Sequence, residues 1–321
     1  MTQLTDRPRL ATEVELVAPV DAHEGPTYVA EEDALYFTTL PRRTGGAPLV
    51  AIRRLALDGD RFPLAPERVS TVVADANVAN GMTIDADGAL VVCEQGSLEA
   101  DAAITRIDRV TGVREVVVDS FASRRLSSPN DVVVKSDGTI WFTDPSYGHL
   151  QGFRPEPETA DAVYRYDPRD GRLSVAADSL DKPNGLAFSP GETELYVGDS
   201  SANQEPGSFH TDRPHRVRAF DVVHSDRLAA ERAFADIEPG FPDGIKVDSE
   251  GRVYVSSFSG VQVFAPGGEP LGQIDLPGCV NFTFGGPAGD LLFVTTDDAI
   301  WAARLEATGP PTRREPEPWP L

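Results

Sequence analysis

A segment of 18 residues occurs six times in this chain of 321 residues. Each copy has a leading polar residue at its second position, continues as a short apolar run, turns at an acidic or Gly-containing tetrad and returns as a second apolar run. The copies start at His23, Ala79, Pro129, Pro183, Pro242 and Val280, the last being degenerate. Repeats constrain a fold strongly, because each unit must bury its apolar face against its neighbours. The sequence therefore predicts a repeat architecture.

The spacing of the copies indicates how large each unit is. Their leading polar residues are separated by 56, 50, 54, 59 and 38 residues, and they are Glu24, Asn80, Asn130, Asn184, Asp243 and Asn281. Such a period fits four strands with their turns and is too long for a leucine-rich or ankyrin repeat. Asp87-Gly88 and Asp137-Gly138 join two β-rich runs, as hairpin turns do. We therefore predict an all-β fold, a six-bladed β-propeller with four-stranded antiparallel blades.

Closing the ring removes long exposed sheet edges, which is the physical advantage of radial repetition. The run 13–18 is expected to supply the outer strand of the last blade. We predict a single domain over residues 1–321, with a core at about 11–306 and a Pro-rich C-terminal extension at 307–321.

Composition limits the partners. A formal net charge of −22, with no Lys/Arg cluster longer than a pair, disfavours nucleic acids and anionic membranes. Cys93 and Cys279 form no Cys-x-x-Cys pair and are interpreted as buried apolar residues. No secretion signal or membrane span is recognisable, so we expect a cytoplasmic protein, monomeric or a simple homo-oligomer.

The leading residues predict a site on the axis. The innermost strand of each propeller blade lines the central channel, so equivalent positions form a ring of side chains. Glu24, Asn130, Asn184 and Asp243 would offer two carboxylates and two amides there, a donor set that favours Ca²⁺, Mg²⁺ or Mn²⁺. For any one Asn-Gly or Asp-Gly pair taken alone, an ordinary turn is the better explanation. A turn alone would not require Glu24 at the matching position of the first copy.

A second ring is predicted where each hairpin returns. Counting 14 or 15 residues from each lead gives Thr38, Glu94, Asp144, Asp199, Ser257 and Thr295 or Thr296. We expect Glu94 and Asp144 to contact substrate and Asp199 to be a candidate catalytic base. The alternative is that these acids are solvated strand ends.

Four ordered motifs carry a resemblance to a known family. Residues 24–26 (EGP), 124–148 (RRLSSPNDVVVKSDGTIWFTDPSYG), 182–190 (KPNGLAFSP) and 242–255 (PDGIKVDSEGRVYV) resemble the SMP-30/gluconolactonase/luciferin-regenerating-enzyme-like family, in wording closest to bacterial gluconolactonases. The resemblance runs from about His23 to Trp301. It implies a six-bladed propeller that hydrolyses lactones with one catalytic divalent cation, often Ca²⁺, with Zn²⁺, Mn²⁺ or Mg²⁺ accepted.

The resemblance also assigns residues. The family's metal ligands fall on Glu24, Asn184 and Asp243, and Asn130 matches a residue that contacts metal or substrate. Asn80 and Asn281 are not ligands in this assignment, and Asn281-Phe282 departs from the usual blade lead.

For a lactone, the metal would bind the carbonyl oxygen, Asn130 would orient the substrate, and Asp243 or Asp199 would take a proton from the attacking water. Tyr147 and His149 are expected to touch substrate, beside covering insertions at 148–159 and 201–213. The sequence contains no serine-hydrolase, zincin or P-loop motif. A non-sugar lactone or phosphotriester substrate stays open, as does a propeller that binds a metal and a ligand without catalysis.

Overall fold

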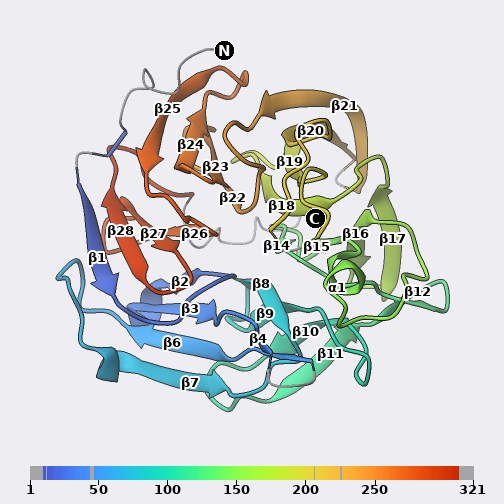
Figure 1. Cartoon of the computed structure of the whole chain (residues 1–321), viewed down its shortest axis with the longest axis horizontal. Coiled ribbons are helices and arrows are strands. Elements are labelled where there is room, and N and C mark those ends of the chain that lie inside the picture. The colour runs from blue at the N-terminus through green and yellow to red at the C-terminus, as the bar shows by residue number, and fades with distance from the viewer. Residues whose placement is uncertain (1–9, 12, 44–46, 206, 225, 311–321) are drawn as a thin grey trace, which may run out of the picture.

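Six antiparallel four-stranded sheets are arranged radially around an axis in the computed structural model, which describes residues 10–310 apart from 12, 44–46, 206 and 225 (Figure 1). The predicted six-bladed β-propeller is confirmed. Within these residues, no helix is long and apolar enough to cross a membrane. Residues 311–321 of the predicted C-terminal extension lie outside the described residues.

Each blade runs from an innermost strand at the axis to an outermost strand at the rim. In that order, the first is β2 (Thr27–Val29), β3 (Ala34–Thr38), β6 (Ile52–Ala56) and β7 (Val69–Val73), and the second is β8 (Ala79–Ile84), β9 (Leu90–Glu94), β10 (Ala103–Ile107) and β11 (Arg114–Val118). The third is β14 (Val132–Val134), β15 (Ile140–Asp144), β16 (Ala162–Asp167) and β17 (Arg172–Ala177), and the fourth is β18 (Pro183–Phe188), β19 (Glu194–Asp199), β20 (Arg216–Val223) and β21 (Arg227–Asp236). The fifth is β22 (Ile245–Val247), β23 (Val253–Ser257), β24 (Gly260–Phe264) and β25 (Pro270–Asp275).

The last blade closes the ring with strands from both ends of the chain. It combines β26 (Phe282–Gly285), β27 (Leu291–Thr295) and β28 (Ile300–Arg304) with the N-terminal β1 (Val14–Ala18). Val14 pairs with Ala303 and Leu16 with Trp301, and Figure 1 shows the blue β1 beside the red β28. The outer strand predicted at 13–18 is thus confirmed. It gives the sixth blade its fourth strand.

Apolar side chains fill the spaces between blades. Each of six buried clusters draws residues from two neighbouring blades, so the cluster of Val91 and Cys93 on β9 also contains Phe142 and Tyr164 of the third blade. Cys93 and Cys279 are both buried, as predicted. Burial of this kind supplies most of the driving force that holds the blades together.

The innermost strands meet at the axis at very short range. They contact one another in the cyclic order β2, β8, β14, β18, β22 and β26. The N–H of Gly185 donates to the carbonyl of Asp243 at 3.1 Å, and that of Gly81 to the carbonyl of Asn130 at 2.8 Å. A Cβ atom on Gly185 would lie 2.0 Å from the Asp243 carbonyl oxygen. Close packing between blades therefore requires glycine at positions 81 and 185, directly after the leads Asn80 and Asn184.

The turn interpretation of the Asn-Gly and Asp-Gly pairs is wrong at three positions. Gly81, Gly185 and Gly244 do not adopt the positive φ that would favour glycine in a tight turn. The hairpin glycines behave as predicted, because Gly88 and Gly138 have φ of 84° and 81°.

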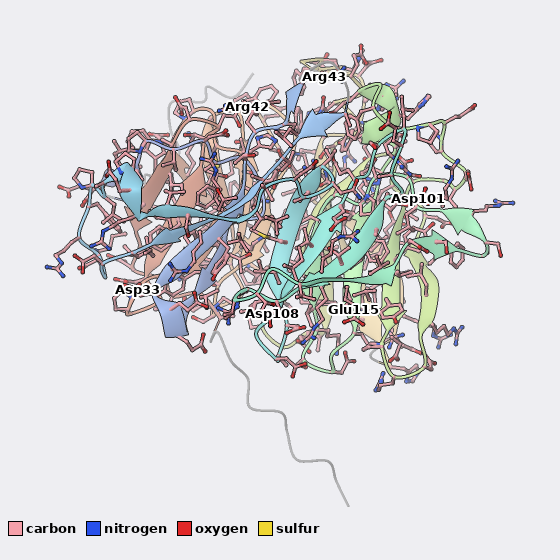
Figure 2. The ribbon with its side chains drawn as sticks, turned by 90° about the horizontal axis from the view of Figure 1, so that it is seen from below. Asp33, Arg42, Arg43, Asp101, Asp108 and Glu115 are labelled. Atoms are coloured by element: carbon pink, nitrogen blue, oxygen red, sulfur yellow. The ribbon has the colours of Figure 1, made fainter. Side chains whose placement is uncertain are left out.

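The two faces of the disc differ in what they carry. Seen edge-on, Arg42 and Arg43 lie at one face, and Asp33 and Asp108 lie at the other (Figure 2). Arg42–Arg43 form β4, which pairs with β5 (Pro48–Leu49). Arg43 donates to the carbonyl of Gln151, directly after the short helix α1 (Tyr147–Leu150). The loop that follows α1 therefore belongs to the same face as β4. A second small hairpin pairs β12 (Ser120–Phe121) with β13 (Arg124–Arg125).

A Gly185→Ala variant tests the packing at the axis. The added methyl group collides with backbone of the next blade, so we expect the free energy of unfolding to fall by about 1–3 kcal/mol. Urea denaturation measures it, with the m-value unchanged. Gly191→Ala is the matched control, because its Cβ would have Thr193 Oγ1 as its nearest neighbour at 3.8 Å and its φ is not positive. Equal losses of stability in both variants would contradict this explanation.

Candidate functional site

The leads that the sequence singles out lie where the innermost strands begin. Asn184 sits in a β-bulge, since Pro183 pairs with Asp199 but Leu186 pairs with Val197, and Asn80 sits in an equivalent bulge of β8. A bulge re-aims a side chain relative to a regular ladder. Asn130 and Asp243 precede β14 and β22 by two residues. The repeat thus delivers one polar side chain per blade to the axis.

Glu24 and Asp243 are two acidic groups that the ring holds near each other. Glu24 is 4% exposed, and its Oε2 accepts hydrogen bonds from Asn281 Nδ2 at 2.7 Å and from the Gly25 N–H at 3.1 Å. Burial raises the pKa of Glu24, and repulsion from Asp243 raises it further. Burial also raises the pKa of Asp243, with the Asp131 charge adding to the shift and a hydrogen bond from Asn184 opposing it. The ring therefore carries negative charge that its own hydrogen bonds only partly balance.

This donor set fits a hard divalent cation. Two carboxylates and two amides, from Glu24, Asp243, Asn130 and Asn184, offer oxygen ligands without sulfur or imidazole. Within the described ranges, no three His, Cys, Asp or Glu side chains gather as a metal site, so the amides are essential to the set. Nearby, Asn80 Oδ1 and Asp131 Oδ2 are buried without a hydrogen-bond partner. Such orphaned oxygens are expected beside a bound ion or its water.

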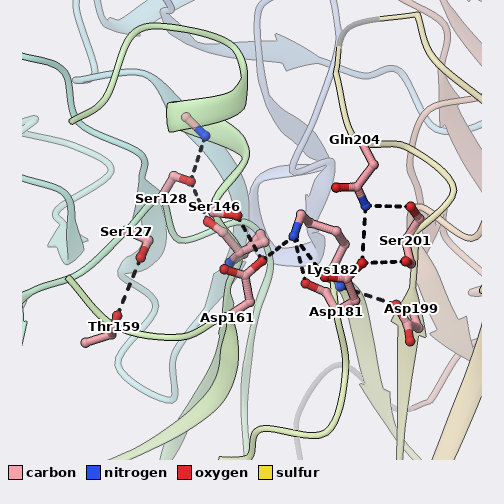
Figure 3. A network of polar contacts seen from close by, with 12 residues as sticks. Ser127, Ser128, Ser146, Thr159, Asp161, Asp181, Lys182, Asp199, Ser201 and Gln204 are labelled. Atoms are coloured by element: carbon pink, nitrogen blue, oxygen red, sulfur yellow. Dashed lines mark hydrogen bonds and ion pairs between the residues drawn. The ribbon is translucent and has the colours of Figure 1, made fainter. Parts of the chain in front are cut away.

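The carboxylates of the predicted second ring have well-defined hydrogen-bond partners. Asp144 is fully buried and accepts the N–H groups of Ser127 at 2.9 Å and Ser128 at 2.7 Å. Asp199 accepts the N–H of Lys182 at 3.3 Å (Figure 3). Ser128 and Lys182 each stand two residues before a lead. These carboxylates therefore fix the loops that deliver Asn130 and Asn184, and their predicted contacts with substrate and with the attacking water stay predictions.

Glu94 is engaged away from the axis. Its carboxylate pairs with Arg114 of the outermost strand through two contacts of 2.6 Å, and it also accepts from Thr105 at 2.8 Å and from Asn77 at 3.0 Å. The Glu94 carboxylate is fully buried, and these donors satisfy its two oxygens. Substrate binding by Glu94 stays a prediction with no contact in the structure that supports it.

A cavity of about 180 Å³ opens beside the ring. The residues that line it are Tyr147, Gln151, Asn203, Gln204, Glu205, Gly207, Ser208, Phe241 and Phe258. Both predicted insertions, 148–159 and 201–213, contribute to this lining. Tyr147 is 5% exposed, and its pKa is raised well above the usual value by burial and by the charge of Asp243, which places the cavity next to the ring. His149 is exposed and is not part of the lining.

A polar network around the buried Lys182 joins the two insertions (Figure 3). Lys182 Nζ contacts Asp161 Oδ2 at 2.9 Å and Asp181 Oδ1 at 3.3 Å. Asp161 also accepts from Ser146 at 3.1 Å, directly before α1. Asp181 accepts from Ser201 at 2.6 Å, at the start of the second insertion. Lys182 thus ties both cavity walls to the loop that delivers Asn184.

Arg154 anchors the first insertion. It is 4% exposed and donates to the carbonyls of Ser127, Leu126, Ser97 and Ala100 at 2.8–2.9 Å. Burial lowers its pKa, because the charged form is desolvated. The sequence reasoning missed this residue, since a lone Arg in a loop carries no motif.

Asn281 is the other missed residue. The family resemblance excludes it as a metal ligand, yet its amide holds Glu24. Its place as the sixth lead was the available signal.

Comparisons with known proteins show which family this chain resembles. Residues 22–298 match the family described as the SMP-30/Gluconolactonase/LRE-like region. The chain is 30% identical to the gluconolactonase of Zymomonas mobilis, covering 94% of this chain and 83% of that protein. It is 28% identical to the lactonohydrolase oryL of Aspergillus oryzae, covering 85% of this chain and 65% of that protein.

A solved structure shows the same likeness. A gluconolactonase from Xanthomonas campestris superposes with a TM-score of 0.75 at 34% identity, covering 94% of this chain and 96% of that one. Sequence, fold and ordered motifs therefore agree, and the chain belongs to the SMP-30/gluconolactonase/LRE-like family.

Proposed function

We propose that this protein is a metal-dependent hydrolase that opens a sugar lactone at the axial ring of Glu24, Asn130, Asn184 and Asp243. Membership of the family and the names of its relatives support the coarser statement that the chain is a lactone-hydrolysing enzyme. The observation that carries the finer proposal is the ring itself, with two partly uncompensated carboxylates beside a cavity of about 180 Å³.

The residues of the axial ring would have different roles in catalysis. A divalent cation held there would supply Lewis-acid stabilisation of the charge that develops on the lactone carbonyl oxygen. Asn130 orients the substrate with its amide. Asp243 is partly exposed and can meet a water molecule, so it accepts the proton of the attacking water. Asp199 fits this task less well, because its carboxylate is bound to the Lys182 N–H.

Metal binding is testable without activity. In chelator-stripped protein, Ca²⁺ at 100 times its Kd should raise the free energy of unfolding by about 2.7 kcal/mol, because only the folded ring binds it. Glu24→Gln should remove most of this gain, since it removes one of two ligand charges. Thermal unfolding followed by circular dichroism measures both. Glu67→Gln, on an exposed residue, should respond like the wild type. An undiminished Ca²⁺ effect in Glu24→Gln would contradict the ligand assignment.

Catalysis is tested by acid release from D-glucono-1,5-lactone with and without chelator. We expect Asp243→Asn to lower kcat by at least about 100-fold, the usual scale for losing a general base. Asp236→Asn, at a largely exposed carboxylate, should retain the wild-type rate. Full activity of Asp243→Asn would remove this residue from the mechanism.

A substrate panel separates the remaining alternatives. Turnover of a non-sugar lactone or a fluorophosphate, but not of the sugar lactone, would change the proposed substrate and leave the proposed active site unchanged. Binding of metal without turnover of any panel member would indicate a non-catalytic ligand-binding propeller. A cytoplasmic location and a monomeric or simple homo-oligomeric state stay predictions.

Asp144 provides a test of how Asn130 is held. Burial raises the pKa of Asp144 to about 7, despite the hydrogen bonds from Ser127 and Ser128. Asp144→Asn leaves one of these N–H groups without an acceptor, which should cost about 1–3 kcal/mol of stability. Asp221→Asn, in an exposed ion pair with Arg232, should cost less than about 0.5 kcal/mol.

The same variant has a predicted pH dependence. An Asp with a folded pKa of about 7 and an unfolded pKa of about 3.9 destabilises the fold progressively as pH rises between those values. Asn does not titrate, so the stability gap between wild type and Asp144→Asn should narrow from pH 5 to pH 8. Urea unfolding at the two pH values measures the gap, and a widening gap would contradict the raised pKa.

A further inference from the structure

The cavity beside the ring has two chemically different walls. Phe241 and Phe258 form one wall, and their rings meet edge to face with centroids 5.2 Å apart. Phe209 extends this wall outward and meets Phe258 at 5.3 Å. Phe258 is 46% exposed and Phe209 is 37% exposed. Exposed aromatic rings grouped at a cavity mark a place where an apolar surface is bound.

The exposed Phe258 ring is nevertheless held in place. Gly240 lies directly beneath it, and a Cβ on Gly240 would stand 2.7 Å from the Phe258 ring. Gly240 also has φ of 105°, so both its conformation and its contact require glycine. With Phe241 and Phe209 at its sides, the ring is a preorganised surface, which lowers the entropic cost of binding.

The remaining wall is largely polar, and Glu205 is its single charged side chain among the described residues. Gln151, Asn203, Gln204 and Ser208 line it, and Gln204 has a fixed position. Its Nε2 donates to the Ser201 carbonyl at 2.6 Å and to Asp181 Oδ2 at 3.2 Å (Figure 3). The amide nitrogen is therefore used by the protein, and the amide oxygen is the group that can accept from a ligand. No Lys, Arg or His is among the described residues of the lining, so the cavity disfavours an anionic ligand.

Two residues of the lining place this cavity beside the axial ring. Phe241 precedes Asp243 by two residues, and Tyr147 at the other side is under the influence of the Asp243 charge. A lactone whose carbonyl group faces the axial ring of ligands must direct the rest of the lactone ring, with its substituents, toward the face of the disc. The cavity walls meet that remainder.

Resting on the proposed function, we propose that Phe241 and Phe258 bind the apolar C–H face of the lactone and that Gln204 accepts a hydrogen bond from its hydroxyl groups. The substrate class is thereby narrowed to uncharged lactones with one apolar face and a hydroxylated rim. Phe258 would contact the face of the lactone ring, which any lactone of this size has. Gln204 would bind the hydroxyl groups, which a sugar lactone has and an unsubstituted lactone lacks.

Two substrates separate these roles. D-glucono-1,5-lactone carries the hydroxyl groups, and δ-valerolactone has the same ring without them. Phe258→Ala should raise KM about tenfold for both compounds with kcat little changed, the effect of losing about one aromatic contact. Gln204→Leu should raise KM about tenfold for D-glucono-1,5-lactone and leave δ-valerolactone within twofold. Where δ-valerolactone is not turned over, its Ki against the sugar lactone replaces KM.

Two controls isolate the cavity. Ser201→Ala removes another donor to Asp181 from the same network but does not line the cavity, so any change in KM should be the same for both lactones. Val110→Ala changes a side chain that is 91% exposed in another blade and should behave like the wild type.

Each contrary result has a separate meaning. Unchanged KM values in Phe258→Ala, or δ-valerolactone that neither reacts nor inhibits, would overturn the role of the aromatic wall. An equal effect of Gln204→Leu on both lactones, or an effect matched by Ser201→Ala, would overturn hydroxyl recognition by Gln204. Wild-type protein that hydrolyses neither lactone would instead overturn the proposed function.

Discussion

The close approach of the six innermost strands at the axis is the constraint on which the rest of this structure depends. Backbone of one blade lies against backbone of the next, and Gly185 and Gly244 leave room only for hydrogen where a Cβ would meet Asp243 or Asn281 within 2.2 Å. A lead residue followed by such a glycine has its side chain confined to the axis. The third blade differs, because Asp131 follows Asn130, and there Gly81 of the neighbouring blade makes the space that Asp131 occupies.

This crowding has an electrostatic consequence. Carboxylates withdrawn from water near one another are unfavourable, and the raised pKa values of Glu24 and Asp243 express that cost. The protein offsets part of it with the amides of Asn281 and Asn184. Asp144 and Asp199, one step further from the axis, use backbone N–H groups for the same purpose. A bound divalent cation would offset the remainder at the axis, which links the stability of the ring to the chemistry proposed for it.

Much of the fold could be predicted from the sequence because repetition averages out local ambiguity. Six copies of one pattern predicted the blades, and the β-rich run 13–18 predicted the closing strand. The leads were found by position alone. What they do was harder, because Asn281 and Asn184 look alike in sequence, although Asn281 donates to Glu24 and Asn184 to Asp243. Counting along a hairpin located Glu94 correctly at the end of β9 but could not reveal Arg114, which reaches it from the outermost strand. The aromatic wall was not predicted, since Phe209, Phe241 and Phe258 meet only after two blades and an insertion have folded together.

We propose that the axial ring binds one divalent cation through four oxygen ligands from four blades. An anomalous difference map from crystals grown with Ca²⁺ would locate the ion. We expect one strong peak on the axis, about 2.3–2.6 Å from side-chain oxygens of Glu24, Asn130, Asn184 and Asp243. A map without a peak there, or with a peak coordinated by other residues, would contradict it.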